Sequence, residues 1–404
     1  MDRLCAAAPA LDAPRHTVGC ILRQFLPALV SSLGLGARAR RLLWRLASCR
    51  TGELGANIFQ CPRCHQEHWC GRSCGDRHCP QCLAAKSRQW LHHQQRSLLP
   101  VTYYHCVFTL PCELNALLRL NPARLYPLFF DCAAQSLLEF GRNRLGGDLG
   151  LSLILHTWGQ QMQFHPHLHG IVTGGALSPE GQRWRAPKQR KFLFPVRALA
   201  TLFRGKFLHG LRRLLQAKAL RLPALFAPTG AAQQQWFTLL YTKRWVLYAK
   251  RPFGGPQQVL SYLSNYTHRV ALSNRRIIAV DEQSAQVTFS YRDYRKGGAL
   301  KALTLPAREF IRRFSLHLLP PRLVRIRHYG ILANNRRQRD IAKARALLQR
   351  RGKPGPAPQT PALRPMEPLR CPRCGQLGLR WIGWIDAYGV RYSVRLRPPV
   401  LDSS

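Results

Sequence analysis

Two Cys-x-x-Cys pairs lie close together in the N-terminal quarter of the chain, at Cys61/Cys64 and Cys79/Cys82. Pairs with about this separation present four thiolates to one zinc ion, and thiols rarely repeat in pairs for packing alone. We therefore predict a structural zinc site at these four residues, inside a small Cys-rich zinc-binding module. The segment between the pairs holds further potential ligands for exchange or a second ion: His65, His68, Cys70, Cys74 and His78.

A third pair, Cys371 and Cys374, lies near the C-terminus, after a segment with six prolines at residues 352–368. Such a segment is typical of a linker. Because one pair supplies only two thiolates, the turn that carries Cys371 and Cys374, a zinc knuckle, either takes ligands from elsewhere or is a remnant of a metal site. We predict a C-terminal tail with no catalytic part.

The charge of the chain indicates a polyanionic partner. Its 62 Lys and Arg residues outnumber 18 Asp and Glu residues, which gives a net charge of +44. A hydrophobic content of 46% belongs to a folded protein, so we predict nucleic acid as the partner. A membrane surface is the competing polyanion, but no apolar run approaches the roughly 20 residues of a spanning helix. Residues 1–15 show no secretory pattern, so we expect a cytoplasmic protein.

The order of the predicted elements is that of an α+β fold. Residues 16–49 have apolar residues at helical spacing, broken at Gly34 and Gly36, and precede the Cys-rich segment as a helical arm. Strands are predicted at 101–111, 149–157, 165–172, 276–280, 286–291 and 322–329, and helices at 122–140 and 336–351. The predicted domains are a helical arm (1–55), a zinc-binding module (56–100), an α+β domain (101–335) and a basic helix, linker and Cys-containing tail (336–404).

Alternating histidines mark the strand predicted at 165–172. Side chains two positions apart lie on one face of a strand, so His167 and His169 point the same way while Leu168 points to the other side. Two imidazoles on a rigid support suit a range of divalent ions and leave coordination positions open. The alternative is that these histidines are ordinary core or surface residues.

Tyr262 and Tyr266 are four positions apart in a predicted helix that begins after Gly254-Gly255-Pro256. Residues four apart share one helix face, so both phenols can reach one site. A single helical tyrosine is most often a half-buried packing residue. The pair is what favours a chemical role.

The three motifs resemble those of a known enzyme class. Phe108-Thr109-Leu110 on an early strand, His167-Leu168-His169 on a later one, and the paired tyrosines resemble the successive motifs of the HUH endonucleases. Longer phrases at residues 156–160, 165–169 and 262–270, with the upstream Cys-rich module, are similar to the two-tyrosine rolling-circle transposases of bacterial insertion sequences, the insertion-sequence-91 family. The resemblance covers roughly residues 20–345 in the same order.

This resemblance implies a metal-dependent nuclease and strand transferase that acts on single-stranded DNA at transposon ends and on target DNA. It implies an HUH core with a five-stranded antiparallel sheet flanked by helices, in a bacterial, nucleoid-associated protein. Tyr262 and Tyr266 would be the nucleophiles of a 5′-phosphotyrosine intermediate, with Mg²⁺ or Mn²⁺ at His167 and His169 and structural Zn²⁺ in the Cys-rich module.

The third ligand of the catalytic ion departs from the pattern of related enzymes. In viral replication relatives an acidic ligand lies seven or eight residues before the first histidine of the motif. Here that window holds Gly159 and Gln160. The carbonyl oxygen of Gln160 is our first choice as ligand, and His156 on the preceding strand is the second.

Basic residues beside aromatic residues are candidate DNA contacts. Lys86 and Arg88 follow the Cys-rich segment, and Arg190 and Lys191 lie in the basic stretch 183–213, which we interpret as a single-strand track. One alternative function is a non-catalytic, zinc-dependent DNA- or RNA-binding protein. A transposase that uses three carboxylates ranks lower, because acidic residues are few and form no evident cluster. The sequence does not define an oligomeric state.

Overall fold

The computed structural model describes residues 15–83, 94, 97–187, 193–223, 230–250, 258–259, 270–350 and 369–393. The chain forms two compact units, each assembled from segments that are distant in sequence. The first unit comprises Met1–Lys86, Arg269–Leu318 and Pro361–Ser404, and the second comprises Ser87–His268 and Leu319–Thr360. The four consecutive domains predicted from the sequence do not coincide with this division.

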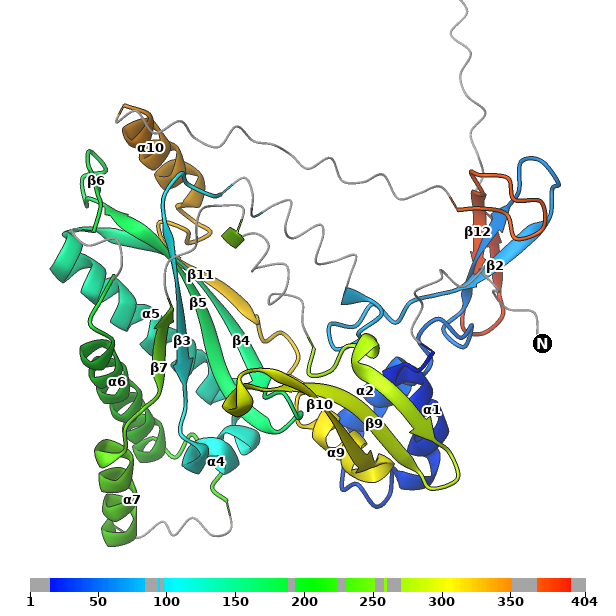
Figure 1. Cartoon of the computed structure of the whole chain (residues 1–404), viewed down its shortest axis with the longest axis horizontal. Coiled ribbons are helices and arrows are strands. Elements are labelled where there is room, and N and C mark those ends of the chain that lie inside the picture. The colour runs from blue at the N-terminus through cyan, green and yellow to red at the C-terminus, as the bar shows by residue number, and fades with distance from the viewer. Residues whose placement is uncertain are drawn as a thin grey trace, which may run out of the picture. The chain divides into compact units, whose positions relative to one another are not determined.

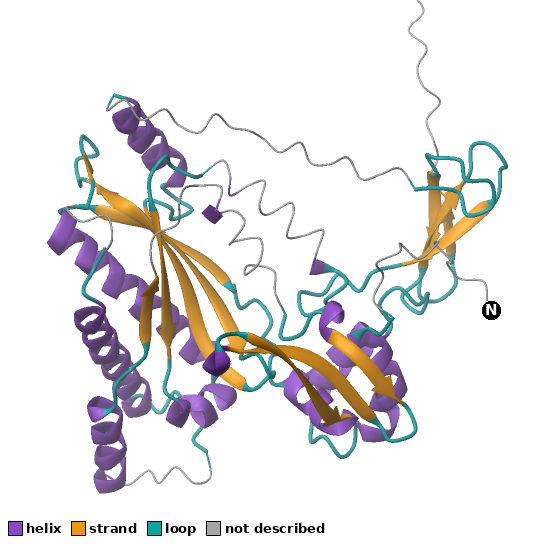
Figure 2. Ribbon diagram, viewed as in Figure 1, coloured by secondary structure: helices purple, strands orange, loops and turns teal. Residues whose placement is uncertain are grey.

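An antiparallel sheet organises the second unit (Figure 1). Its strands follow the order β11-β4-β5-β3-β7, and every pairing along this path is antiparallel. The short strand β6 (Trp184–Arg185) pairs with β5 off this path. The bounds of the other strands are β3 Tyr103–Thr109, β4 Asp148–Trp158, β5 Phe164–Leu177, β7 Leu247–Lys250 and β11 Ile326–Gly330. Figure 2 shows helices beside this sheet, and the predicted α+β fold with a central antiparallel sheet is confirmed.

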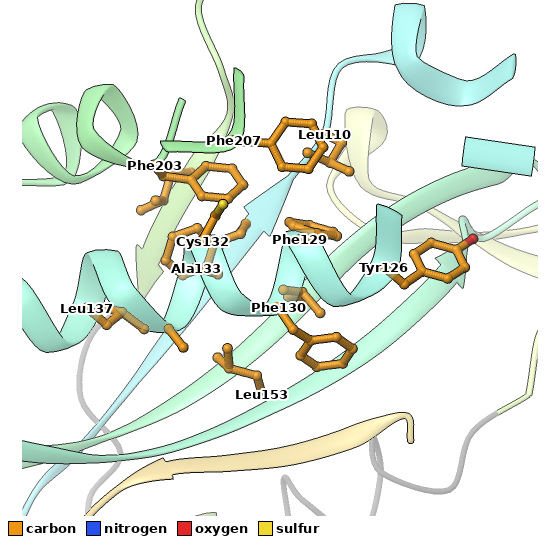
Figure 3. Packing of buried hydrophobic residues seen from close by; sticks show 14 of the residues in the cluster. Leu110, Tyr126, Phe129, Phe130, Cys132, Ala133, Leu137, Leu153, Phe203 and Phe207 are labelled. Carbon is orange, nitrogen blue, oxygen red and sulfur yellow. The ribbon is translucent and has the colours of Figure 1, made fainter. Parts of the chain in front are cut away.

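Helices α5 (Pro122–Leu145) and α6 (Val196–Gln216) bury the apolar face of the sheet. Figure 3 shows Phe203 and Phe207 of α6 packed near Phe129 of α5. Pro122 opens α5, where a missing backbone N–H costs nothing, and Gly146 ends it with a φ of 67° that favours glycine. Further helices of this unit whose bounds the structure describes are η1 Cys112–Leu114, α4 Asn115–Leu120 and α7 Gly230–Thr242.

The opposite face of the sheet carries a separate hydrophobic cluster. Because side chains alternate along a strand, Ile154 and Ile171 point away from α5 and pack with Tyr103 in this cluster. Helix α10 (Arg337–Gln349) adds Ile341, Ala344 and Leu348 to it. The predicted basic helix therefore exists, but it packs in the second unit and does not belong with the C-terminal tail.

The first unit contains the N-terminal helices α1 (Val18–Leu29) and α2 (Ala37–Ala47), separated by the predicted break. Thr17 caps α1, since its Oγ1 accepts a hydrogen bond from the Cys20 N–H at 3.1 Å. Helix α1 packs against α2 and against α9 (Ala307–Ser315) in the same unit. A sheet in the order β10-β9-β8 completes this part, with the bounds β8 Ile277–Asp281, β9 Gln286–Asp293, β10 Ala299–Pro306, η2 Asn274–Arg276 and η3 Tyr294–Lys296.

A second sheet of the first unit joins the two ends of the chain, in the order β13-β12-β1-β2. Its strands are β1 Ala56–Gln60, β2 Glu67–Gly71, β12 Arg380–Ile385 and β13 Arg391–Ser393. β1 pairs with β12 along its whole length, from Ala56 opposite Ile385 to Gln60 opposite Arg380. The segment predicted as a tail is thus a structural part of the Cys-rich module. Among the helices that the structure describes, none has the length and apolar character needed to cross a membrane.

Candidate functional site

Three histidines converge on one face of the second unit's sheet. His156 lies on β4 and His167 and His169 lie on β5, and their ligand atoms all lie within 4.8 Å of one another. Antiparallel pairing places His156 directly opposite His167, which brings the two rings together across the strands. The sheet, and not a loop, therefore fixes the positions of all three imidazoles.

The geometry of the cluster fits a divalent ion. The Nε2 atoms of His167 and His169 are 3.1 Å apart, and the His156 and His169 ring centroids are 4.6 Å apart. Two nitrogens bound to one ion at about 2.1 Å each are separated by roughly 3 Å. Three imidazoles hold such an ion and leave positions for a phosphate oxygen or water.

Hydrogen bonds on the far side of the rings set which nitrogen faces the cluster. His167 Nδ1 is 2.8 Å from the His165 carbonyl oxygen, which only accepts, so a neutral His167 carries its proton there and keeps a lone pair on Nε2. Burial lowers the pKa of His167 to about 4, so this ring is neutral at pH 7. His105 Nε2 on β3 is 3.0 Å from His169 Nδ1 and orients that ring as an outer partner.

The two candidates for the third ligand lie at different places in the sheet. His156, the second choice for third ligand, joins His167 and His169, whereas Gln160 lies in the turn between β4 and β5. His165 shares the strand but is exposed and outside the cluster. Sequence reasoning missed His105, because its place near His169 follows from the register of β3 on β5.

Six predicted site residues lie outside the part of the chain that the structure describes. They are the nucleophile candidates Tyr262 and Tyr266 and the DNA-contact candidates Lys86, Arg88, Arg190 and Lys191. Val259, three positions before Tyr262, is described and fully buried. It belongs to the hydrophobic cluster on the sheet face to which the alternation of the strands also assigns the three histidines.

Among the described residues, eight cysteines form two clusters of four, and the predicted grouping differs from them. Cys79 and Cys82 lie with Cys49 and Cys74, while Cys61 and Cys64 lie with Cys371 and Cys374. The expected single site at Cys61, Cys64, Cys79 and Cys82 is therefore not what the fold forms. The physical reason is the pairing of β1 with β12, which brings the C-terminal pair to the first N-terminal pair.

Both clusters have the chemistry of thiolate metal sites. Neighbouring sulfurs lie 3.6 Å apart in each, for example Cys49 to Cys82 and Cys64 to Cys371. Tetrahedral zinc with bonds of about 2.3 Å separates its sulfurs by roughly 3.8 Å. Hydrogen bonds from Cys74 and Cys79 lower the pKa of Cys49, while the same contact with Cys49 raises the pKa of Cys74. A cation is what allows all four sulfurs to be thiolates together.

Part of the predicted single-strand track is a helix with structural contacts. α6 carries Arg204, Lys206 and Arg212. Lys206 forms an ion pair with Glu139 of α5 at 2.9 Å, and the Arg212 guanidinium lies 4.6 Å from the centre of the Phe237 ring. These two cations stabilise packing within the second unit, and the interpretation of residues 183–213 as a single-strand track stays a prediction.

Two family models match the chain. Residues 150–339 match a family described as "Putative transposase", and residues 21–110 match a "Transposase zinc-binding domain". The first match contains the three clustered histidines, and the second contains the Cys49 cluster. Fold and matches together define a transposase with a zinc-binding domain, and hence a protein that acts on DNA.

Named relatives agree with this class. The "Putative transposase y4qJ" of Sinorhizobium fredii is 41% identical over 331 residues, which cover 80% of this chain and 81% of the relative. The "Transposase for insertion sequence element IS801" of Pseudomonas savastanoi is 27% identical over 340 residues, covering 81% of this chain and 79% of that protein. No solved structure matches the chain. The chain belongs to the insertion-sequence-91 family of transposases, as its motifs predicted.

Proposed function

We propose that this transposase cleaves and rejoins single-stranded DNA at the ends of its element through a 5′-phosphotyrosine intermediate, in rolling-circle-type transposition. The observation that carries the proposal is the cluster of His156, His167 and His169 on adjacent strands. A binding protein that only holds DNA needs no such grouping of imidazoles.

The three histidines would hold a divalent ion, Mg²⁺ or Mn²⁺, with Gln160 as the competing third ligand. When bound, such an ion neutralises charge on the scissile phosphate and aligns the backbone. On the protein side, the His165 carbonyl and His105 keep the nitrogens of His167 and His169 directed at the cluster.

Tyr262 and Tyr266 would supply the nucleophiles. The phenol oxygen of one tyrosine attacks phosphorus and gives its proton to solvent, the bond from phosphorus to the 3′ oxygen breaks, and that oxygen takes up a proton to leave as a 3′-hydroxyl. A 3′-hydroxyl of another strand later displaces the tyrosine and restores a phosphodiester, so no external energy source is needed. Support for this placement comes from Val259, which is buried on the histidine face of the sheet, three positions before Tyr262.

The metal role is tested by single-strand nicking with matched histidine variants. His156→Ala and His167→Ala should each reduce nicking at least tenfold at limiting Mn²⁺, since removing a ligand lowers the affinity of the site for the ion. His165→Ala is the control, because this exposed histidine lies on the same strand outside the cluster. Gln160→Ala separates the two third-ligand candidates, and we expect a smaller loss than with His156→Ala.

Metal removal gives the complementary result. EDTA should abolish nicking, and Mg²⁺ or Mn²⁺ should restore it without added zinc. Undiminished nicking by the metal-free protein would contradict the proposal. In that case, retained DNA binding would favour the non-catalytic, zinc-dependent nucleic-acid-binding function.

A further inference from the structure

The N-terminal and C-terminal knuckles are copies of one local structure. Residues 61–66 read Cys-Pro-Arg-Cys-His-Gln and residues 371–376 read Cys-Pro-Arg-Cys-Gly-Gln. In the first, the Cys61 N–H donates to the Gln66 carbonyl at 3.0 Å and the His65 N–H to the Cys61 carbonyl at 3.1 Å. In the second, the Cys371 N–H donates to the Gln376 carbonyl at 2.8 Å and the Gly375 N–H to the Cys371 carbonyl at 2.9 Å.

The turn residue after the second cysteine is left-handed in both knuckles. His65 has a φ of 54° and Gly375 a φ of 72°. This turn directs both sulfurs of a pair, and the N–H groups around them, toward one point. A glycine at position 375 adopts the conformation freely, while His65 holds it at a cost that a bound ion would offset.

The two knuckles face one another with their sulfurs in contact. Cys61 Sγ is 3.6 Å from Cys374 Sγ, and Cys64 Sγ is 3.6 Å from Cys371 Sγ. Cys61 and Cys371 are buried. His68 Nε2, on β2, lies 3.1 Å from Cys371 Sγ, so its N–H can donate to that sulfur and reduce the negative charge of the group.

We propose that Cys61, Cys64, Cys371 and Cys374 bind one Zn²⁺ that fastens the C-terminal segment 369–393 to the N-terminal module. This ion is separate from the one held by Cys49, Cys74, Cys79 and Cys82. Four thiolates in a closed tetrahedral arrangement select Zn²⁺ over hard cations such as Mg²⁺. Two of the ligands lie beyond the matched family domains, which end at residues 110 and 339.

The proposed ion would close a very long loop. Cys61 and Cys374 are 313 positions apart. Among the described residues, the segment 369–393 also contacts the N-terminal module through the pairing of β12 with β1 and through side chains such as Arg391 and Glu67, 2.7 Å apart. A cross-link that joins distant positions restricts the unfolded chain, and the binding energy of such an ion is folding energy of the joined segments. Losing the ion should therefore release β12 and β13 before it affects the rest of the chain.

Zinc content of the purified full-length protein tests the proposal. The variant Cys371→Ser/Cys374→Ser should contain one zinc equivalent less than the wild type by elemental mass spectrometry. Cys79→Ser/Cys82→Ser should also lose one equivalent. The variant that combines both double changes, called the four-residue variant, should lose two. Cys112→Ser is the control, because this exposed cysteine lies outside both clusters and should leave the zinc content unchanged.

Limited proteolysis gives a second readout. Because chelation applies it to the wild-type protein, it does not require a variant that folds. With zinc bound, trypsin should cut the wild type slowly at Arg380, within β12. Chelation, or the Cys371→Ser/Cys374→Ser change, should raise that cutting rate at least tenfold. An unchanged zinc content in the Cys371/Cys374 variant would overturn the proposal. So would a loss of only one equivalent in the four-residue variant, since that result describes a single shared site.

Discussion

His328 is one residue whose protonation makes the stability of the second unit depend on pH. Its ring shares a hydrogen bond with Ser152 at 2.9 Å, and burial, with the nearby charge of Arg337, lowers its pKa to about 4. In the unfolded chain a histidine takes up its proton near pH 6.5. Between these values the unfolded state binds more protons, so acidification from pH 7 toward pH 4 destabilises the fold.

We predict that His328→Gln flattens part of this dependence. At pH 5 the wild-type ring should cost at most about 2 kcal/mol relative to pH 7, with solvent screening reducing the figure. Urea unfolding of wild type and variant at pH 7, 6 and 5 measures the difference. A variant that loses as much stability as the wild type over this range would contradict the assignment.

Single residues also show where sequence reasoning ended. Alternation along one strand was enough to predict that His167 and His169 share a face. His156 and His105 needed the register of neighbouring strands. This register places His156 opposite His167, and it places Val107, two positions after His105, opposite His169. A register is set by turn geometry and by packing between strands, so the spacing of residues within one strand does not reveal it.

At the scale of elements, α6 is a helix that was not predicted, because its many basic residues drew attention away from its apolar period. Its apolar residues Leu199, Phe203, Phe207 and Leu211 recur every fourth position and are buried, yet the prediction from sequence considered only the basic residues around them, as a single-strand DNA track. Helix α5 and the strands β3, β4, β5, β8, β9 and β11 were predictable because turn residues and prolines bound clear periodic segments. The helical period of α6 was present in the sequence and was outweighed by its charge.

The packing of α6 gives the prediction at this scale. Phe203 is buried against Phe108, Phe129 and Trp245, with ring centroids 5.0 to 5.8 Å away. Phe203→Ala should lower the free energy of unfolding by about 3–5 kcal/mol, because the cavity is lined by rings that cannot close it. Urea unfolding measures this loss. Leu239→Ala on α7 is the control and should cost under about 1 kcal/mol, since Leu239 is half exposed.

At the scale of the whole molecule, the composition predicted the class of partner. It did not predict which segments of the chain pack together. The net charge of +44 indicated nucleic acid, and the family confirms DNA. The return of residues 369–393 to the first unit was not predictable, because a Cys-x-x-Cys pair has no marker of which other pair it meets. Cys49 and Cys74 are single cysteines in the sequence, so only the fold groups them with Cys79 and Cys82.

The charge of the molecule also predicts how binding responds to salt. Each phosphate neutralised on a single strand contributes about −0.7 to the slope of log affinity against log salt concentration. With 62 cationic residues in the chain, we expect a slope of about −4 or steeper for a single-stranded oligonucleotide. Fluorescence anisotropy at several salt concentrations measures it. A slope near zero would mean that few phosphates are contacted.

The covalent intermediate is the most direct test of the proposed chemistry. Labelled single-stranded DNA carrying an element end should become linked to the wild-type protein with Mg²⁺ or Mn²⁺, and mass spectrometry should place the linkage on Tyr262 or Tyr266. Tyr→Phe removes one oxygen and keeps the ring, so loss of the adduct is chemical in origin. Each single variant should retain an adduct on the remaining tyrosine, and Tyr262→Phe/Tyr266→Phe should bind DNA without forming one. An adduct on any other residue, or undiminished nicking by the double variant, would contradict the mechanism.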